Sequence, residues 1–518
     1  MRRRPRRNNP PALVIANSIP FPLRSEFPAE LALIRGFFQA AGFGEATLCR
    51  GLGMEDMSGL GQVAWEKVAA DVFSAAGYWC LGVFARGRPV AAGTAREICG
   101  EPVLQALLNT GLLRPSRKDP AALVCPVWLY PLAGFVIASD RVDDPDGEPF
   151  TPPTDVVFPA IYAGTLRFLG LLPAVAGGEA LDLCGGSGIG ALLLSRTARQ
   201  TATTDLAERS AWFATFNARL NDVRVESLGG DLYEPLAGRQ YDVITAHPPF
   251  VPALGQNMVY RDGGDSGEEV IRGVVAGLPA HLRAGGTCVV LCVARDTETQ
   301  TFEQRVQEWL GVNRDEFDVV FGLEKVLTVN EVIKSLQKQG RQVGELETRQ
   351  LAERFQALGT RQFVYGAVFI RRYAGLVNQA PGRIRITPLA GAADFQRLLD
   401  WRGQVRQADF LERLAAARPR LAPDLQLTAR HVVRDGSLVP AEFVFEIETG
   451  VRAALRPDPW VVPLVARLEG RLTVAEVFAG AVAADELPAG FALKDFLGLV
   501  RGMIERGFLE ADLAGPKP

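Results

Sequence analysis

The chain of 518 residues has few histidines, few cysteines and almost no excess of either charge. Three histidines are too few for a metal site built mainly from imidazole, and no spacing of metal ligands is visible, so we expect no metal. Seven cysteines in a chain of this length do not form a disulfide framework. Lys and Arg number 56 and Asp and Glu 59, giving a net charge of −3, so only a local patch could attract nucleic acid.

Long apolar runs are also scarce. The stretch 121–138 has no charged residue, but Pro126, Pro131 and Gly134 interrupt it, which predicts two short buried strands and argues against a membrane span. Five arginines lie among the first seven residues, and the apolar stretch behind them is too short and too interrupted for a secretory signal. We therefore expect a flexible basic segment, no membrane partner and a cytoplasmic protein.

Length and composition fit a globular protein of about three domains. Apolar residues recur at helical spacing over 30–41 and 62–76, and a short helix is expected over 101–111. These helices precede the two strands. A helix-turn-helix pattern near the C-terminus resembles a winged helix; it lacks a cluster of Lys and Arg, which favours partner docking over DNA binding. The expected divisions are a basic segment (1–24), a helical and short β accessory domain (25–154), an α/β domain (155–373) and an α+β domain with a winged-helix-like end (380–518).

The α/β expectation rests on alternation of strands and helices, which is typical of a doubly wound sheet. The expected strands cover 180–183, 201–204, 224–228, 241–246, 287–294 and 362–373, with helices over 189–196, 207–220 and 267–282. A polar helical insertion over 325–358 precedes the last strand.

A glycine-rich turn follows the first strand of this domain. Asp182 and Cys184 lead into Gly185, Gly186 and Gly188, and a helix begins directly afterwards. Glycines permit such a turn and let a ligand lie against bare backbone. The pattern also satisfies the G-x-G-x-x-A form of a dinucleotide fingerprint, although a tight strand-to-helix turn alone explains it equally well.

Two further carboxylates follow the next two strands. Asp205 ends the second strand, where it could accept the hydroxyls of a ribose, and Asp231 follows the third, within reach of an adenine amino group. Each alone is more often a loop-capping residue. At successive strand ends, they predict one ligand crevice at the carboxyl edge of the sheet.

A nicotinamide dinucleotide and S-adenosylmethionine compete for this crevice. We expect Asp182 to lie within the glycine turn, where its charge would repel a pyrophosphate and suit a ligand with ammonium and sulfonium groups. The sequence therefore favours S-adenosylmethionine.

The fourth strand leads into His247, Pro248, Pro249 and Phe250. Two prolines fix φ and remove two backbone donors, so this loop is rigid enough to hold an acceptor against a transferring methyl group. Phe250 offers an aromatic face to a planar acceptor. A proline-terminated strand is the structural alternative.

Together these motifs resemble class I S-adenosylmethionine-dependent methyltransferases. They look most like the methyltransferase small-domain branch, which includes release-factor glutamine methyltransferases and ribosomal RNA guanine-N2 methyltransferases. The glycine-rich stretch 260–267 resembles the loop that follows the motif in that branch. The resemblance covers 155–373 and implies a Rossmann-like domain of seven strands.

The resemblance also implies residue roles. The methionine part of the cofactor would lie beside Cys184, Gly185, Gly186 and Gly188, near Asp182. The ribose would be bound by Asp205, and the adenine would lie beside Asp231 and Leu232. The acceptor would be held by His247, Pro248, Pro249 and Phe250.

Two positions depart from the family. Cys184 stands at the first glycine position, and His247 replaces an asparagine that binds the amino hydrogens of the acceptor. Imidazole accepts one hydrogen bond and also takes a proton. His247 is therefore either a positioning group or a general base, for which an ordinary histidine pKa near 6.5 would be suitable.

The acceptor itself stays open. The sequence favours transfer to a nitrogen or oxygen atom of a protein, peptide or small molecule. An RNA base is the alternative, supported by the arginine-rich start but not by the acidic balance of the chain. A non-enzymatic regulatory protein with a docking domain is the third possibility, against which the intact carboxylates argue. Nothing in the sequence indicates an oligomeric state.

Overall fold

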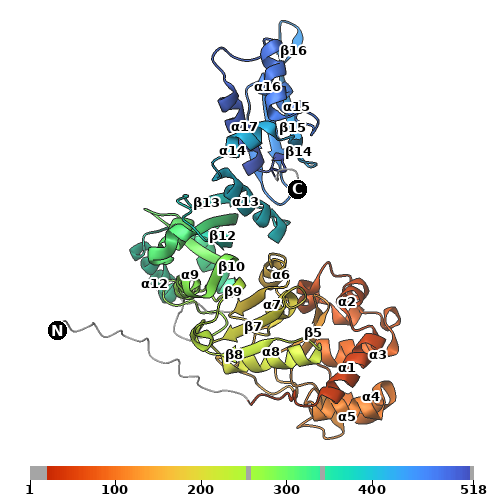
Figure 1. Cartoon of the computed structure of the whole chain (residues 1–518). Coiled ribbons are helices and arrows are strands. Elements are labelled where there is room, and N and C mark those ends of the chain that lie inside the picture. Colours follow the sequence, from red (N-terminus) through yellow and green to blue (C-terminus); the bar gives the residue numbers. More distant parts are fainter. Residues whose placement is uncertain (1–19, 253–257, 339–344, 514–518) are drawn as a thin grey trace, which may run out of the picture. The chain divides into compact units, whose positions relative to one another are not determined.

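The computed structural model describes residues 20–252, 258–338 and 345–513, and its residue contacts divide the chain into two compact units. The first unit comprises 1–169 and 174–281, and the second 170–173 and 282–518. In Figure 1 the first unit runs from red to yellow-green and the second from green to blue. Most of the basic segment expected over 1–24 lies outside the described residues, and the four expected domain boundaries stay predictions.

The first unit begins with short helices and short strands. The helices are α1 (Pro28–Ala41), α2 (Glu45–Leu52), α3 (Ala75–Cys80), α4 (Ala92–Cys99) and α5 (Glu101–Asn109). The strands β1 (Val90–Ala91), β2 (Arg114–Pro115) and β3 (Ala122–Val124) form one small sheet. The expected helices over 30–41 and 101–111 are thus confirmed.

The helix expected over 62–76 is wrong. Three 3-10 turns, Met57–Gln62, Trp65–Lys67 and Ala70–Val72, interrupt this stretch, and α3 begins only at Ala75. Val63 and Val68, which follow the first two turns, adopt extended backbone angles. Helical spacing of apolar residues therefore did not overcome the preference of β-branched residues for extended backbone.

The uncharged stretch 121–138 contains β3 and a hairpin of β4 (Trp128–Leu132) and β5 (Phe135–Ser139). Ala133 and Gly134 turn the chain with positive φ, as two-residue hairpins require. Short buried strands are thus confirmed, although the stretch contains three of them where two were expected. Within the described residues, no helix is long and apolar enough to cross a membrane. The cytoplasmic location stays a prediction.

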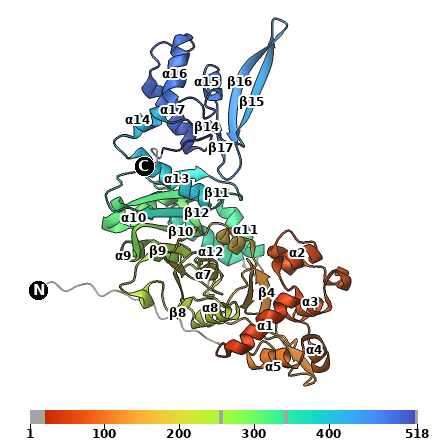
Figure 2. The ribbon, with the colours of Figure 1, turned by 45° about the vertical axis from the view of Figure 1, so that its right-hand side comes forward.

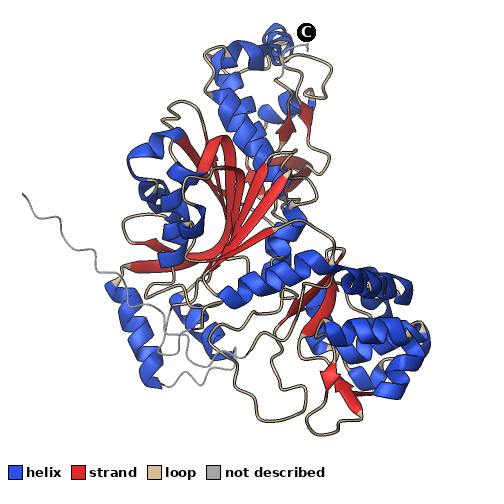
Figure 3. Cartoon of the chain, turned by 60° about the horizontal axis from the view of Figure 1, so that its bottom comes forward, coloured by secondary structure: helices blue, strands red, loops and turns tan. Residues whose placement is uncertain are grey.

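The first unit then continues as four parallel strands in the order β9-β6-β7-β8. These are β6 (Glu179–Leu183), β7 (Gln200–Asp205), β8 (Glu226–Gly229) and β9 (Tyr241–Ala246). The helices are α6 (Ala163–Leu169), α7 (Ile189–Leu194), α8 (Glu208–Leu220) and α9 (Glu269–His281). Figure 3 shows the helices of the chain in blue and its strands in red. The alternation expected from the sequence is confirmed.

The hairpin of β4 and β5 is hydrogen-bonded to the C-terminal end of α8. The side chain of Asn217 both accepts a hydrogen bond from the N–H of Ala138 in β5 and donates one to its carbonyl, at 2.8 and 2.9 Å. Asn221 does the same for Val136 at 2.8 Å in each direction. These amides satisfy one edge of β5, which would otherwise present unpaired backbone groups.

The second unit opens with long antiparallel strands. β12 (Thr360–Arg372) lies between β10 (Leu282–Thr297) and β11 (Phe317–Leu327), and β13 (Gly382–Arg385) pairs in parallel with β11. Helices α10 (Phe302–Trp309), α11 (Val329–Lys338) and α12 (Glu345–Ala357) belong to the same region. Seven described strands, β6 to β12, thus lie between 155 and 373, which is the expected number. β11 was missed, and its last three residues overlap the start of the expected helical insertion.

The remaining residues form an α+β region, as expected. Its helices are α13 (Ala392–Val405), α14 (Phe410–Ala416), α15 (Val461–Ala466), α16 (Val474–Ala483) and α17 (Leu493–Glu505). Its strands are β14 (Arg420–Leu421), β15 (Gln426–Arg434), β16 (Ser437–Ile447), β17 (Ala453–Leu455) and β18 (Leu509–Glu510). β15 and β16 form the long hairpin seen in Figure 2. The winged-helix likeness stays a prediction.

Candidate cofactor and acceptor site

The carboxyl ends of the four parallel strands lie level with one another. Leu183 of β6 is paired with Thr204 of β7 and with Ala246 of β9. Two backbone hydrogen bonds join the loops beyond these ends, from Gly185 N–H to the Thr204 carbonyl at 3.1 Å and from Gly230 N–H to the Asp205 carbonyl at 2.9 Å. The structure therefore brings the loops that carry the predicted site residues to one sheet edge, within the first unit.

The glycine turn is packed on one side and open on the other. A Cβ at Gly185 would stand 1.9 Å from Thr203 Oγ1, and one at Gly188 would stand 2.7 Å from the Cβ of Ala214. A Cβ at Gly186 would meet nothing within 4 Å. The backbone at Gly186 is therefore the stretch of the turn against which a ligand could lie.

Cys184 follows β6 with φ +56°, a conformation that favours glycine. A glycine at this position, which the resemblance in the sequence implies, would adopt this conformation without strain. Burial, together with the charges of Asp205, Asp182 and Asp231, raises the pKa of the thiol well above 9.0. The thiol is therefore protonated at neutral pH and is a poor nucleophile.

Asp182 lies within strand β6 and not within the turn, which corrects the placement expected from the sequence. Its buried carboxylate accepts a hydrogen bond from the Thr245 hydroxyl at 2.7 Å and another from the N–H of Ala191 in α7. Burial raises its pKa to about 7, an effect that these two hydrogen bonds oppose. Asp182 thus joins β6, β9 and α7, and the charge argument against a pyrophosphate loses its force.

Asp205 ends β7, as expected, and holds the glycine turn. One carboxylate oxygen accepts the N–H of Gly186 at 2.9 Å and the other accepts the N–H of Ala207 at 3.0 Å. Burial raises the pKa of this carboxyl, although hydrogen bonds from Ala207, Gly186 and Ser210 lower it. Each carboxylate oxygen has a further lone pair, so the group can accept ligand hydroxyls while it holds the turn.

The turn beyond β8 is fixed by contacts that the sequence did not reveal. The carbonyl of Leu232, which has φ +46°, accepts the Thr204 hydroxyl at 2.8 Å. Tyr233 donates to the carbonyl of Val274 at 2.8 Å and stacks on His281 with ring centroids 4.4 Å apart. The carboxylate of Asp231 is exposed at the same turn. Gly273 and Gly277 of α9 leave room for the side chains of this turn, and their spacing of four residues was the available signal in the sequence.

The acceptor loop follows β9. The imidazole of His247 stacks on Phe168 of α6, with centroids 5.4 Å apart and an angle of 27°, and lies 6.3 Å from the ring of Phe250. A Cβ at Gly164 would stand 3.7 Å from His247 Cε1, an ordinary van der Waals distance, so Gly164 lies directly beside the imidazole. The sequence did not identify Gly164 or Phe168; aromatic residues shortly before the glycine turn were the available signal.

Burial lowers the pKa of His247 from 6.5 to about 4. The imidazole is therefore neutral at physiological pH, with one nitrogen free to accept a hydrogen bond and the other to donate one. Among the described residues, neither ring nitrogen has a hydrogen-bond partner. A group with so low a pKa is a weak general base, which favours the positioning role for His247.

The glycine-rich loop 260–267 supports Pro249 and Phe250. A Cβ at Gly263 would stand 2.6 Å from the Pro249 carbonyl oxygen, and one at Gly267 would stand 2.5 Å from that of Phe250. The N–H of Val251 donates to the carbonyl of Arg261 at 3.0 Å, and Gly263 donates back to Val251 at 2.8 Å. The two loops therefore pack together closely and are joined by backbone hydrogen bonds.

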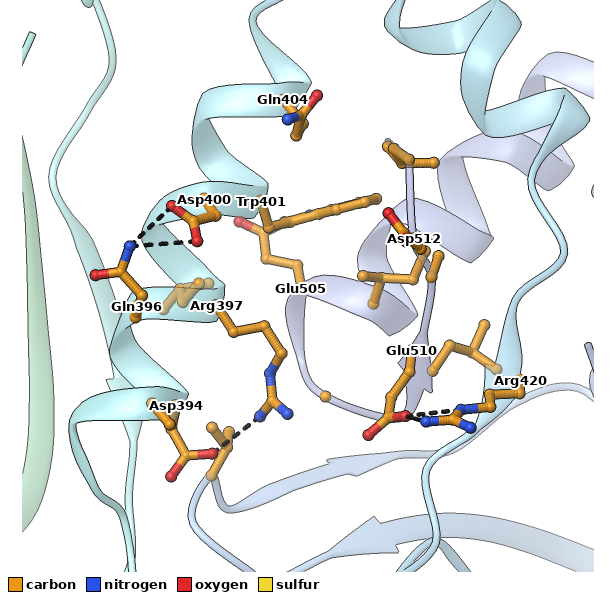
Figure 4. Close-up of a pocket in the computed structure, with 18 of the residues that line it drawn as sticks. Asp394, Gln396, Arg397, Asp400, Trp401, Gln404, Arg420, Glu505, Glu510 and Asp512 are labelled. Carbon is orange, nitrogen blue, oxygen red and sulfur yellow. Dashed lines mark hydrogen bonds and ion pairs between the residues drawn. The ribbon is translucent and has the colours of Figure 1, made fainter. Parts of the chain in front are cut away.

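The second unit contains a cavity of its own, of about 760 Å³, bounded by α13, α17 and β18 (Figure 4). The polar pairs at its wall are Arg397 with Asp394, Gln396 with Asp400, and Arg420 with Glu510. The carboxylates of Glu505 and Asp512 also line this cavity, and none of its lining residues belongs to the predicted site. The described residues contain no group of three or more His, Cys, Asp or Glu that could hold a metal ion.

Comparison with known proteins gives matches for the same region. Residues 159–320 match the model of the methyltransferase small domain. A ribosomal protein uL3 glutamine methyltransferase from Xanthomonas campestris pv. campestris is 32% identical over 145 residues, covering 25% of this chain and 46% of that protein. A release factor glutamine methyltransferase from Gloeobacter violaceus is 28% identical over 166 residues, covering 27% and 57%.

The chain thus spans about half the length of the curated relatives it matches. Among solved structures, a 16S rRNA N2 G1207 methyltransferase from T. Thermophilus, in complex with AdoMet and guanosine, aligns with a TM-score of 0.26 and 15% identity. That alignment covers 55% of this chain and 63% of the other.

Proposed function

We propose that this chain is an S-adenosylmethionine-dependent methyltransferase whose acceptor is a nitrogen or oxygen atom of a polypeptide. The observation that carries the proposal is the meeting, at one edge of the parallel strands, of an open glycine turn, the carboxylate of Asp205 and the loop of His247. The match of residues 159–320 to the methyltransferase small domain supports the same activity.

The residues present fit this cofactor. The open backbone at Gly186 would lie beside its methionine part, Asp205 would accept the ribose hydroxyls, and Asp231 and Leu232 would edge the adenine. Bound there, S-adenosylmethionine supplies an activated methyl group, so the protein mainly has to hold the acceptor in line. The nearby Cys184 stays protonated and does not compete for that methyl group.

The acceptor side provides rigidity and one neutral imidazole. Pro248 and Pro249 restrict the loop, and Gly263 and Gly267 let the neighbouring loop support it closely. The unprotonated nitrogen of His247 would accept a hydrogen bond from the N–H or O–H of the acceptor and so orient its lone pair. Proton loss to water completes the transfer.

A polypeptide acceptor is supported by two of the relatives, which are named as glutamine methyltransferases of a ribosomal protein and of a release factor. A small-molecule acceptor fits the same loop. The family's asparagine is absent here, so the acceptor atom of this chain need not be a glutamine nitrogen.

Calorimetry with S-adenosylmethionine tests the cofactor assignment. We expect Asp205→Ala to weaken binding on the order of 100-fold, since hydrogen bonds to a charged group contribute about 1.5–3 kcal/mol each. Asp205→Asn, which keeps one oxygen, should lose less. The exposed Asp71→Ala should bind as the parent does. Lack of binding by the parent, or equal affinity of the parent and Asp205→Ala, would overturn the assignment.

A further inference from the structure

Three aromatic rings stack at the surface beside the acceptor loop. The ring of Phe158 lies between those of Tyr162, at 4.4 Å and 20°, and Tyr260, at 4.7 Å and 3°. We name Phe158, Tyr162 and Tyr260 the aromatic stack. Its two tyrosines are 44% and 36% exposed, although each stacks one ring face on Phe158.

The aromatic stack is built from the two segments that contact the acceptor loop. Tyr162 directly precedes α6, whose Gly164 and Phe168 lie against the imidazole of His247. Tyr260 belongs to the glycine-rich loop, which exchanges backbone hydrogen bonds with Val251. A further backbone hydrogen bond, from Val259 N–H to the Thr154 carbonyl at 3.0 Å, joins these two segments to each other. Backbone hydrogen bonds and ring contacts therefore connect the stack to the loop of His247.

The segment that begins with Tyr260 carries a net negative charge. From 260 to 269 the chain has four carboxylates and one arginine. Arg261 is paired with Asp262 at 2.8 Å, while Asp265 and Glu269 are exposed. Such a surface repels phosphate groups and attracts ammonium and guanidinium groups, and exposed tyrosine faces add a favourable cation–π contribution.

We infer that the aromatic stack, with Asp265 and Glu269, docks a segment of the polypeptide acceptor that carries lysine or arginine close to the methylated residue. This inference rests on the proposed function and deepens it, because it states what the acceptor presents beside the reacting atom. RNA, which also stacks on tyrosine, would need cations for its phosphates where this surface has carboxylates.

Fluorescence anisotropy with three labelled probes tests the docking surface. The probes are a nonapeptide with a central glutamine, two lysines and two arginines among glycines; the same peptide with glutamate in place of each cation; and single-stranded decauridylate. We expect the parent to bind the cationic peptide about tenfold more tightly than either other probe. Tyr162→Ala and Tyr260→Ala should weaken that binding roughly three- to tenfold, and Tyr162→Phe should retain it.

Trp212→Ala is the matched control, because Trp212 of α8 is a 47% exposed aromatic outside the stack. Equal binding of the cationic and acidic peptides, tighter binding of the oligonucleotide, or an equal loss in Trp212→Ala would overturn the inference. Affinity for S-adenosylmethionine and thermal unfolding are measured on every variant. Intact cofactor binding with no preference among the probes contradicts the docking surface alone, whereas absent cofactor binding in the parent contradicts the proposed function.

Discussion

At the residue scale, the site depends on polar groups whose protonation is set by burial. His247 is neutral because its surroundings do not stabilise an imidazolium, and its contacts are with the rings of Phe168 and Phe250. Asp182 and Asp205 have raised pKa values for the corresponding reason, since burial disfavours the carboxylate. The two aspartates nevertheless differ in role, because Asp182 supports the fold of the turn and Asp205 is placed to meet a ligand.

The lowered pKa of His247 predicts how methyl transfer depends on pH. The imidazole becomes protonated only near pH 4. The plot of methyl-transfer rate against pH should therefore show no transition with a midpoint near pH 6.5. His247→Asn, which restores an amide that can orient the acceptor, should lower turnover by less than about tenfold and leave the profile between pH 5.5 and 8 unchanged. Labelled methyl incorporation measured across this range checks both. A transition in this plot near pH 6.5 that is present in the parent and absent in His247→Asn would show that His247 is the general base.

The raised pKa of Asp182 predicts how stability depends on pH. A carboxyl that titrates near 7 when folded and near 3.8 when unfolded stabilises the fold at low pH, and this contribution is lost as the pH rises from about 4 to 7. Each pKa unit corresponds to about 1.4 kcal/mol. Asp182→Asn cannot ionise, so its free energy of unfolding should increase relative to the parent over this window. Urea unfolding at pH 4.5 and 7.5 measures the difference, and a constant difference would contradict the assignment.

At the element scale, the loops of the site are held in place by close backbone contacts with neighbouring segments. The backbone of the glycine-rich loop packs closely on the loop of Pro249 and Phe250, where only glycine leaves room at 263 and 267. The turn beyond β8 likewise packs on α9 at Gly273 and Gly277, where a Cβ would stand 2.6 Å from Leu232 Cδ1 and 2.2 Å from the Tyr233 ring. Close approach of a neighbouring backbone therefore fixes the position of both segments.

Gly263→Ala tests this enforcement. Its Cβ would press on the carbonyl oxygens of Pro249 and Gly267, which are backbone atoms that cannot rotate away. We expect methyl transfer to fall about 100-fold, as a displacement near 1 Å produces, with unchanged affinity for S-adenosylmethionine. Gly36→Ala in α1, where a Cβ meets nothing within 4 Å, should retain full activity and gain roughly 0.5–1 kcal/mol of stability. Full activity of Gly263→Ala would show that the loop is not held this way.

The sequence predicted well those elements in which local signals and tertiary structure agree. The parallel strands β6 to β9 end within about a residue of their expected positions because an apolar run and a turn motif mark each end. β11 was missed because its polar C-terminal half continues into a polar helix, and 62–76 was taken for a helix because spacing alone does not reveal extended valines. Asp182 was placed in the turn because nothing local shows that Thr245 and Ala191 bind its side chain.

At the scale of the whole molecule, every predicted site residue belongs to the first unit. That unit also includes the hairpin of β4 and β5, which Asn217 connects to the site, since its side chain donates a second hydrogen bond to the carbonyl of Ser187 in the glycine turn at 2.9 Å. Residues before 155 therefore help to fix the turn and are more than an appended substrate module. A docking role for the C-terminal α+β region stays a prediction.

The central claim is methyl transfer to a polypeptide, and one measurement tests it most directly. Lysate fractionated into protein, RNA and small molecules is incubated with the chain and S-adenosylmethionine labelled in its methyl group, with Asp205→Ala as the control for background. The account predicts label in protein that resists nuclease and is released by protease, and little label with the variant. Label confined to RNA or small molecules, or equal label with the variant, would contradict it.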